Sequence, residues 1–122
     1  MARVLVIDDS AIIRDLLVDF LTEEGYEVEA TGDSTEGIQM ALTGQFDLCF
    51  CDLHIPKKNG YQVFCEVSAA RPGLQFIFTD SMPDHLAEHA QRSGVSYCLR
   101  KPFDLDQLRD VLHKVSPPVK TR

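Results

Sequence analysis

Five polar side chains stand at the end of short apolar runs in this sequence, and their types suit phosphoryl chemistry. They are three aspartates, one threonine and one lysine: Asp8, Asp9, Asp52, Thr79 and Lys101. Carboxylates that crowd together repel each other, so such a group either holds a proton or binds a cation. Oxygen ligands of this kind suit Mg²⁺, which takes one or two carboxylates, several waters and a phosphate oxygen. A lysine and a hydroxyl nearby can bind the oxygens of a phosphoryl group.

The stretch "VLVIDDS", residues 4–10, also has a simpler explanation. Asp9 or Ser10 could cap a following helix, because a side-chain oxygen there accepts a free backbone N–H. Capping needs one acid or hydroxyl, whereas the sequence offers two acids and a serine. Helix capping and a functional acid pair are both open on this stretch alone.

The elements around these residues alternate between strand and helix. Short apolar runs predict strands at 3–7, 27–31, 48–51, 75–79 and 97–99. Helical spacing of apolar residues, capping residues and breakers predict helices at about 12–24, 34–43, 60–70, 82–93 and 105–115. Five such alternations predict an α/β fold with a parallel sheet and helices on both faces.

This fold class gives the five polar residues a common location. In open parallel sheets, ligands bind beyond the carboxyl ends of the strands. Three carboxylates, a hydroxyl and a lysine are therefore expected at one edge of the sheet, and capping alone does not explain that set. No histidine, cysteine or serine stands beside a base that could activate it as a nucleophile, which leaves an aspartate as the acceptor of a phosphoryl group.

Composition limits the classes of function. The chain has 122 residues, a net charge of −7 and no basic run, which argues against direct binding to nucleic acid. No apolar run is long enough to span a membrane, and the N-terminus is too short and too acidic for a signal peptide. We therefore expect a cytoplasmic protein with one domain at 1–116 and a short tail at 117–122.

The cysteines and histidines outside this edge indicate structural roles. None of the four cysteines forms a C-x-x-C pair, and Cys49 and Cys51 should share one buried face of a strand. His85 and His89 stand one helical turn apart and could bind a metal, but solvated surface is the favoured interpretation. His113 is expected at the surface as well.

The chain resembles the response regulator receiver domain of two-component signalling from Arg3 to Val115. The resemblance rests on "VLVIDDS", on "CDLHIPKKNG", on Thr79 at the end of an apolar strand, and on "KPF" at 101–103. It implies a doubly wound, flavodoxin-like sheet of five strands in the order 2-1-3-4-5 with five helices. Pro56 and Gly60 fit the family's turn after the acceptor, and Pro102 fits a peptide that is often cis.

The resemblance also assigns roles to the acids. Asp52 would accept the phosphoryl group, Asp9 would bind Mg²⁺ directly and Asp8 mainly through water. The backbone carbonyl of His54 would supply a further metal ligand, so its imidazole is not implicated.

Two further residues would bind the phosphoryl group itself. Lys101 would pair with its oxygens, and Thr79 would turn inward to hydrogen-bond it. Lys57 and Lys58, in the loop after Asp52, could steer an anionic donor or be solvated.

Two positions depart from the family pattern. Asp80 stands where a small residue is usual, and we expect it either at the lip of the pocket, repelling the donor, or in solvent. Cys98 stands where an aromatic ring usually switches, with Tyr97 one place earlier. Adjacent strand residues face opposite sides, so Tyr97 can replace that ring only if a bulge shifts the register.

The implied function is a signalling module rather than an enzyme with a separate substrate. A histidine kinase or phosphotransfer protein would donate the phosphoryl group, hydrolysis would remove it, and an unidentified downstream protein would read the change. Two alternatives stay open: a receiver fold that docks without phosphorylation, and the receiver part of a longer regulator. An aspartate-based phosphatase would need a second acid at His54, and a flavin carrier would need a Ser/Thr/Gly-rich loop instead of "DDSAII".

Overall fold

The computed structural model describes residues 2–80 and 97–115 of the chain. Five strands form one parallel sheet in the order β2-β1-β3-β4-β5, as the family resemblance implied. The strands are β1 (Arg3–Ile7), β2 (Glu27–Thr31), β3 (Leu48–Asp52), β4 (Gln75–Asp80) and β5 (Tyr97–Arg100).

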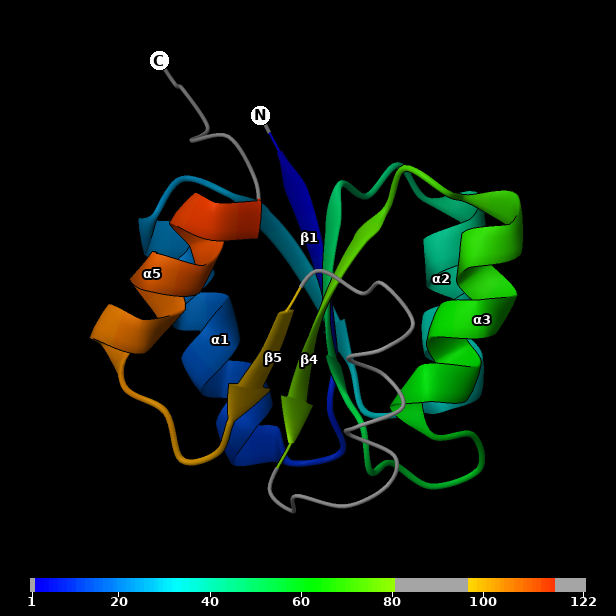
Figure 1. The fold of residues 1–122 in the computed structure, drawn as a ribbon, viewed down its shortest axis with the longest axis horizontal. Coiled ribbons are helices and arrows are strands. Elements are labelled where there is room, and N and C mark those ends of the chain that lie inside the picture. Colours follow the sequence, from blue (N-terminus) through cyan, green and yellow to red (C-terminus); the bar gives the residue numbers. More distant parts are fainter. Residues whose placement is uncertain (1, 81–96, 116–122) are drawn as a thin grey trace.

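Helices cover both faces of the sheet (Figure 1). The described residues contain α1 (Ala11–Glu23), α2 (Ser34–Thr43), α3 (Gly60–Ala70) and α5 (Leu105–Val115). Helices α1 and α5 lie on one face, and α2 and α3 lie on the other. The fifth expected helix, at 82–93, falls outside the described residues, as do the tail and the two histidines proposed as an alternative metal pair.

Each face of the sheet has its own apolar core. The first core, under α1 and α5, joins Val4, Val6, Phe50, Ile77 and Leu99 of the strands to the two helices. The second core, under α2 and α3, contains Leu5, Ile7, Cys49, Cys51, Phe76 and Phe78. Alternate residues of each strand therefore enter opposite cores. Cys49 and Cys51 are buried on one face, as expected, and a hydrogen bond with Cys49 together with burial raises the pKa of Cys51.

The helix boundaries follow local chemistry. Ser10 caps α1 by accepting a hydrogen bond from the N–H of Ile13, and Gly25, with φ of 99°, follows the end of that helix. Asp33 caps α2 by accepting from the N–H of Glu36. Asp33 and Glu36 do not form a complete capping box, because the Glu36 carboxylate accepts a hydrogen bond from the Thr31 hydroxyl instead of the Asp33 N–H.

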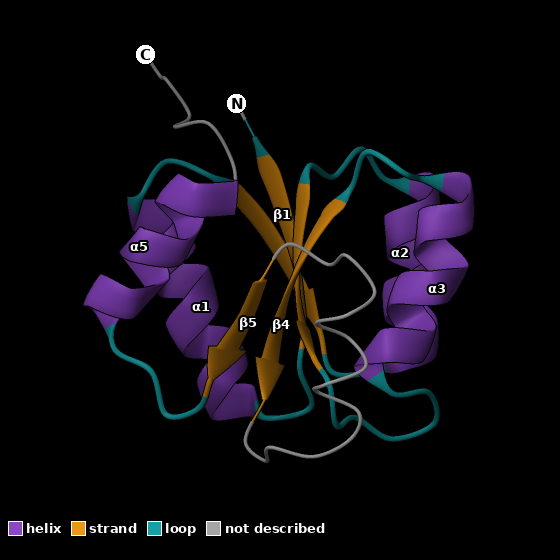
Figure 2. Ribbon diagram, in the orientation of Figure 1, coloured by secondary structure: helices purple, strands orange, loops and turns teal. Residues whose placement is uncertain are grey.

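Three strands extend one residue beyond their predicted ends. Asp52 pairs with Thr79, and Asp80 pairs with Arg100, so β3, β4 and β5 all continue into polar residues. The strands of the parallel sheet have their carboxyl ends at one edge, which is the lower edge in Figure 2. This edge carries the polar residues identified from the sequence.

Candidate functional site

Three carboxylates form a compact group at the carboxyl edge of the sheet. Asp8 and Asp9 follow β1, Asp52 ends β3, and one carboxylate oxygen of each lies within 4.8 Å of the others. Asp8 and Asp52 are buried, whereas Asp9 is exposed. Close oxygen ligands with one side open to water fit Mg²⁺, which retains several waters when it binds to proteins. The prediction that the edge brings these acids together is confirmed.

In the loop after β1, the serine and the two acids have different roles. Ser10 provides the helix cap, and its own N–H donates to Oδ1 of Asp8 at 2.9 Å. Asp9 is not the cap of α1. Capping thus explains the serine of "VLVIDDS" and leaves both acids for the cluster.

The surroundings of Asp52 shift the pKa of its carboxylate upward. Burial raises its pKa, and the nearby charge of Asp8 raises it further, although Lys101 opposes both effects. The N–H of His54 donates to Oδ1 of Asp52 at 3.3 Å. The Asp52 carboxylate is therefore held by a backbone hydrogen bond and lies between a negative and a positive side chain.

Lys101 lies between the two buried acids. Its Nζ atom is 2.9 Å from Oδ2 of Asp8 and 3.3 Å from Oδ2 of Asp52. Burial alone would lower the pKa of Lys101, but the two carboxylates raise it above its usual value. The Lys101–Pro102 peptide is cis, as the resemblance implied, and Phe103 packs against the first core.

Thr79 and the turn after β3 complete the edge. Thr79 is buried and pairs in register with Asp52 across neighbouring strands. A Cβ atom at Gly60 would lie 2.5 Å from the backbone oxygen of Asp52, so only glycine permits this approach of α3 to the acceptor strand. The Ser34 hydroxyl donates to the backbone oxygen of Pro56 at 2.9 Å and fixes the far side of the same turn.

Asp80 does not extend into solvent, which was one of its two expected places. Its side chain is 4% exposed and lies 3.2 Å from Nε2 of His54. Because Thr79 and Asp80 are adjacent in a strand, their side chains point to opposite faces. The imidazole of His54, which the resemblance left without a role, is therefore in contact with a buried acid.

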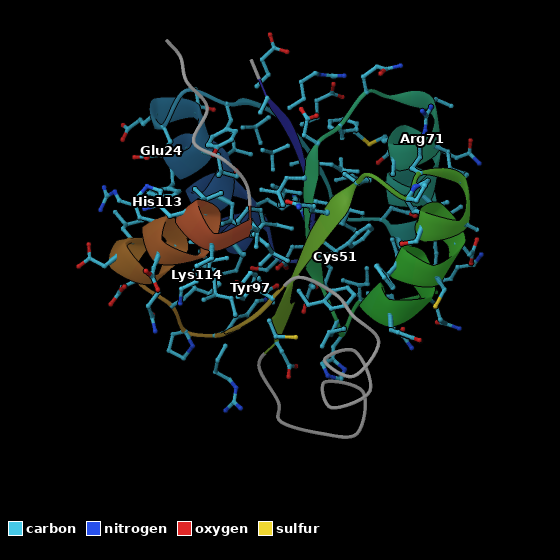
Figure 3. The ribbon with its side chains drawn as sticks, turned by 45° about the horizontal axis from the view of Figure 1, so that its top comes forward. Glu24, Cys51, Arg71, Tyr97, His113 and Lys114 are labelled. Atoms are coloured by element: carbon cyan, nitrogen blue, oxygen red, sulfur yellow. The ribbon has the colours of Figure 1, made fainter. Side chains whose placement is uncertain are left out.

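Cys98 occupies the place in β5 where the family usually has an aromatic ring. Cys98 pairs with Phe78 and packs against the second core, and the β4–β5 register continues without a bulge from Tyr97 to Arg100. Tyr97 is 38% exposed and, like Leu99, belongs to the side of the sheet that faces α1 and α5 (Figure 3). The tyrosine thus does not take the place of the missing ring.

Both loop lysines have acidic partners. Lys57 Nζ lies 2.6 Å from Oδ2 of Asp33, and Lys58 Nζ lies 2.6 Å from Oε2 of Glu66. The Lys57 contact lowers the pKa of Asp33. Arg100 is exposed, and so is His113, as expected.

Two positioning contacts were not identified from the sequence. Arg14 Nη1 donates to the backbone oxygen of Asp8 at 2.8 Å, and Ser34 holds the turn after β3. Helical spacing placed Arg14 one turn into α1, but no motif linked either side chain to the site.

Comparison with known proteins decides the family. The sequence profile described as "Response regulator receiver domain" matches residues 4–113. The chain belongs to this family. The receiver fold, with its strand order, and a place in two-component signal transduction therefore follow for this chain.

Curated relatives of this receiver domain are longer regulators. The transcriptional regulatory protein PdtaR of Mycobacterium tuberculosis is 33% identical over 107 residues, which cover 87% of this chain and 52% of PdtaR. The transcriptional regulatory protein GlrR of Escherichia coli is 33% identical over 128 residues, covering 99% of this chain and 28% of GlrR. The chain thus spans about half of one relative and less than a third of the other.

Solved receiver structures superimpose over nearly the whole chain. The chemotaxis protein CheY4 of Vibrio cholerae has a TM-score of 0.87 and 27% identity, covering 95% of this chain and 99% of CheY4. The response regulator TrrA of Thermotoga maritima, solved in complex with Mg²⁺-BeF, has a TM-score of 0.85 and 28% identity, covering 95% of this chain and all of TrrA. Within residues 2–80 and 97–115 of our receiver domain, no helix is long and apolar enough to cross a membrane.

Proposed function

We propose that this receiver domain accepts a phosphoryl group on Asp52 in the presence of Mg²⁺. The observation that carries the proposal is the group of three carboxylates, Asp8, Asp9 and Asp52, with Lys101 in contact with two of them. A buried acid that is held among opposing charges at the open end of a sheet is suited to attack phosphorus.

The transfer is a simple exchange of bonds. A carboxylate oxygen of Asp52 forms a bond to phosphorus while the bond between phosphorus and the donor breaks. The electron pair of that bond leaves with the donor, which is an imidazole nitrogen of a phosphohistidine or the carboxylate of acetyl phosphate. The product is an acyl phosphate, and attack by water on phosphorus later returns the free carboxylate and inorganic phosphate.

The surrounding residues each have a part in this reaction. Mg²⁺, held by Asp9, Asp52 and the His54 carbonyl, with Asp8 mainly through water, would neutralise charge on the carboxylates and on a phosphoryl oxygen. Lys101 would exchange its contact with Asp52 for a phosphoryl oxygen, and Thr79 would hydrogen-bond another.

The partners follow from this chemistry. A histidine kinase or a phosphotransfer protein would be the donor, and a downstream protein would read the phosphorylated state in the cytoplasm. We propose that the chain is not an enzyme with a separate substrate, because it catalyses only its own phosphorylation and dephosphorylation. The length of PdtaR and GlrR makes the receiver part of a longer regulator a natural alternative.

A receiver fold that docks without phosphorylation is the second candidate. It is favoured by Cys98, since the ring that usually couples the site to the output surface is absent. The two candidates differ in one respect, which is whether Asp52 becomes phosphorylated.

The test is the intact mass of the protein after incubation with acetyl phosphate. The wild type with Mg²⁺ should gain the mass of one phosphoryl group, and chelation of Mg²⁺ should prevent the gain. Asp52→Asn should not be labelled, whereas Asp47→Asn, an exposed acid before the opposite end of the same strand, should label like the wild type. Equal labelling of the Asp52→Asn variant would reject the assignment.

A further inference from the structure

The side chain of His54 connects the loop after β3 to the end of β4. Its Nε2 atom lies 3.2 Å from Oδ1 of Asp80, and the exposed fractions of the two side chains are 26% and 4%. His54 follows β3, which carries the acceptor, whereas Asp80 is the last residue of β4. The contact therefore joins the acceptor loop to the strand that carries Thr79.

The backbone of His54 is the part of this residue that faces the acceptor. Its N–H donates to Oδ1 of Asp52 at 3.3 Å, and its carbonyl is the metal ligand in the proposed function. Any contact that fixes the side chain of His54 also restricts the orientation of these two backbone groups.

Asp80 is a firm anchor for such a contact. Its backbone oxygen accepts a hydrogen bond from the N–H of Lys101 at 2.7 Å, and the oxygen of the preceding Thr79 accepts from the N–H of Leu53 at 2.9 Å. The residue is thus held by β3 on one side and by the Lys101 end of β5 on the other.

A buried carboxylate at this position requires a partner. Removing an acid from water costs several kcal/mol unless a hydrogen bond or an opposite charge compensates for it. Nε2 of His54 lies 3.2 Å from this carboxylate, a close contact without the geometry of a hydrogen bond, and the small residue usual at this position in the family could not form it.

We propose that Asp80 is a positioning residue that acts through His54: their contact holds the His54 backbone in the orientation that coordinates Mg²⁺. This inference rests on the proposed function, since it concerns the metal site of the phosphorylation reaction. The imidazole itself is not a ligand in this account. Outer contacts of this kind typically change metal affinity by about 10- to 100-fold.

A purely electrostatic role of Asp80 makes a different prediction. A nearby negative charge attracts Mg²⁺, so the loss of Asp80 would weaken binding in that case too. The loss of the His54 imidazole removes no negative charge, and electrostatics alone would leave Mg²⁺ affinity unchanged or increase it. If the contact positions the His54 backbone, loss of the imidazole should weaken Mg²⁺ binding as the loss of Asp80 does, because either substitution breaks the same contact.

The experiment is a calorimetric titration with Mg²⁺ of the wild type and five variants. Calorimetry is suitable because the chain has no tryptophan to report binding by fluorescence. Asp80→Ala and His54→Ala should each weaken Mg²⁺ binding by roughly tenfold. The double variant should bind no more weakly than the weaker single variant, because the contact can be lost only once. Lys58→Ala, which breaks an exposed ion pair with Glu66 in the same loop, should bind like the wild type.

A conservative variant separates positioning from a general loss of structure. The amide of His54→Gln can donate a hydrogen bond to Asp80, so this variant should recover most of the Mg²⁺ affinity that His54→Ala loses. Amide NMR spectra without metal should show the changes in Asp80→Ala and His54→Ala confined to the neighbourhood of residues 52–54 and 79–80. Wild-type affinity in His54→Ala, or equal losses in His54→Gln and His54→Ala, would overturn the proposal.

The outcomes distinguish this inference from the function on which it rests. If the wild type neither binds Mg²⁺ nor becomes phosphorylated, the proposed function fails. If the wild type does both and the Asp80 and His54 variants bind Mg²⁺ equally well, only the positioning role fails.

Discussion

The Nζ atom of Lys101 lies 2.9 Å from Oδ2 of Asp8, although the two residues are 93 positions apart in the sequence. The same ammonium group is 3.3 Å from Asp52. Lys101 therefore compensates for part of the charge of the acidic group before any metal or phosphoryl group arrives. In the proposed function, a phosphoryl group on Asp52 would compete with Asp8 for this lysine.

Removal of Lys101 should destabilise the protein most when no Mg²⁺ is present. Lys101→Ala leaves buried carboxylates without their cation, which should lower the free energy of unfolding by about 1–3 kcal/mol. Mg²⁺ supplies positive charge to the same acids and should restore part of that loss. Urea unfolding with chelator and with Mg²⁺ measures both quantities, and an identical loss in the two conditions would contradict the shared charge compensation.

Asp9 should be necessary for metal binding but not for folding. It is exposed and is not the cap of α1, so Asp9→Ala should fold normally and be as stable as the wild type or slightly more so without metal. Mg²⁺ at a hundredfold excess over its Kd should stabilise the wild type by about 2.7 kcal/mol and the variant by nothing. Thermal melts with and without Mg²⁺ test this, with the exposed acid substitution Asp19→Ala as a control that keeps the full gain. A wild-type response of Asp9→Ala to Mg²⁺ would remove Asp9 from the ligand set.

The raised pKa of Asp52 predicts how stability depends on pH in chelator. Burial and Asp8 raise this pKa above the usual value of 3.8, so the native state holds a proton that the unfolded state has released. The free energy of unfolding should therefore fall as pH rises from the usual value through the raised pKa. Asp52→Asn lacks this effect, so its stability advantage over the wild type should grow across that window and then become constant.

Urea unfolding of both proteins from about pH 4 to about pH 8 measures this advantage. An advantage of Asp52→Asn that shrinks with rising pH would mean that the pKa of Asp52 is lowered instead.

Because Cys98 stands where an aromatic ring is usual, the structural response to phosphorylation should stay close to the site. Beryllofluoride, a mimic of the phosphoryl group, should shift the amide resonances near Asp52, Thr79 and Lys101. The shifts should fade along β5 and α5, because Cys98 packs in the second core and Tyr97 faces the other side of the sheet. Large shifts at Tyr97 would show that its ring has taken over the switching role.

Much of the site could be predicted because parallel strands bring their carboxyl ends to one edge. The apolar runs predicted the strands. The polar residues that follow these runs were then the site candidates, namely Asp8, Asp9, Asp52 and Lys101. Alternation along β5 also predicted that Tyr97 cannot replace Cys98, and the continuous register confirms it.

The contact between His54 and Asp80 could not be predicted in the same way. It depends on β4 continuing to Asp80 and on the loop after β3 bringing His54 beside that residue, and no local pattern specifies either. The Arg14 and Ser34 contacts also join residues whose proximity is set only by the packed fold.

The most direct test of the central claim is to locate the phosphorylated residue. Borohydride reduces an aspartyl phosphate to homoserine and leaves a free carboxylate unchanged, so the modified residue can be identified by peptide mass spectrometry. After treatment with acetyl phosphate and Mg²⁺, followed by borohydride, we expect homoserine at position 52 alone and none when Mg²⁺ is chelated. Homoserine at Asp8 or Asp9, or unmodified Asp52 with Mg²⁺ and donor present, would contradict the account.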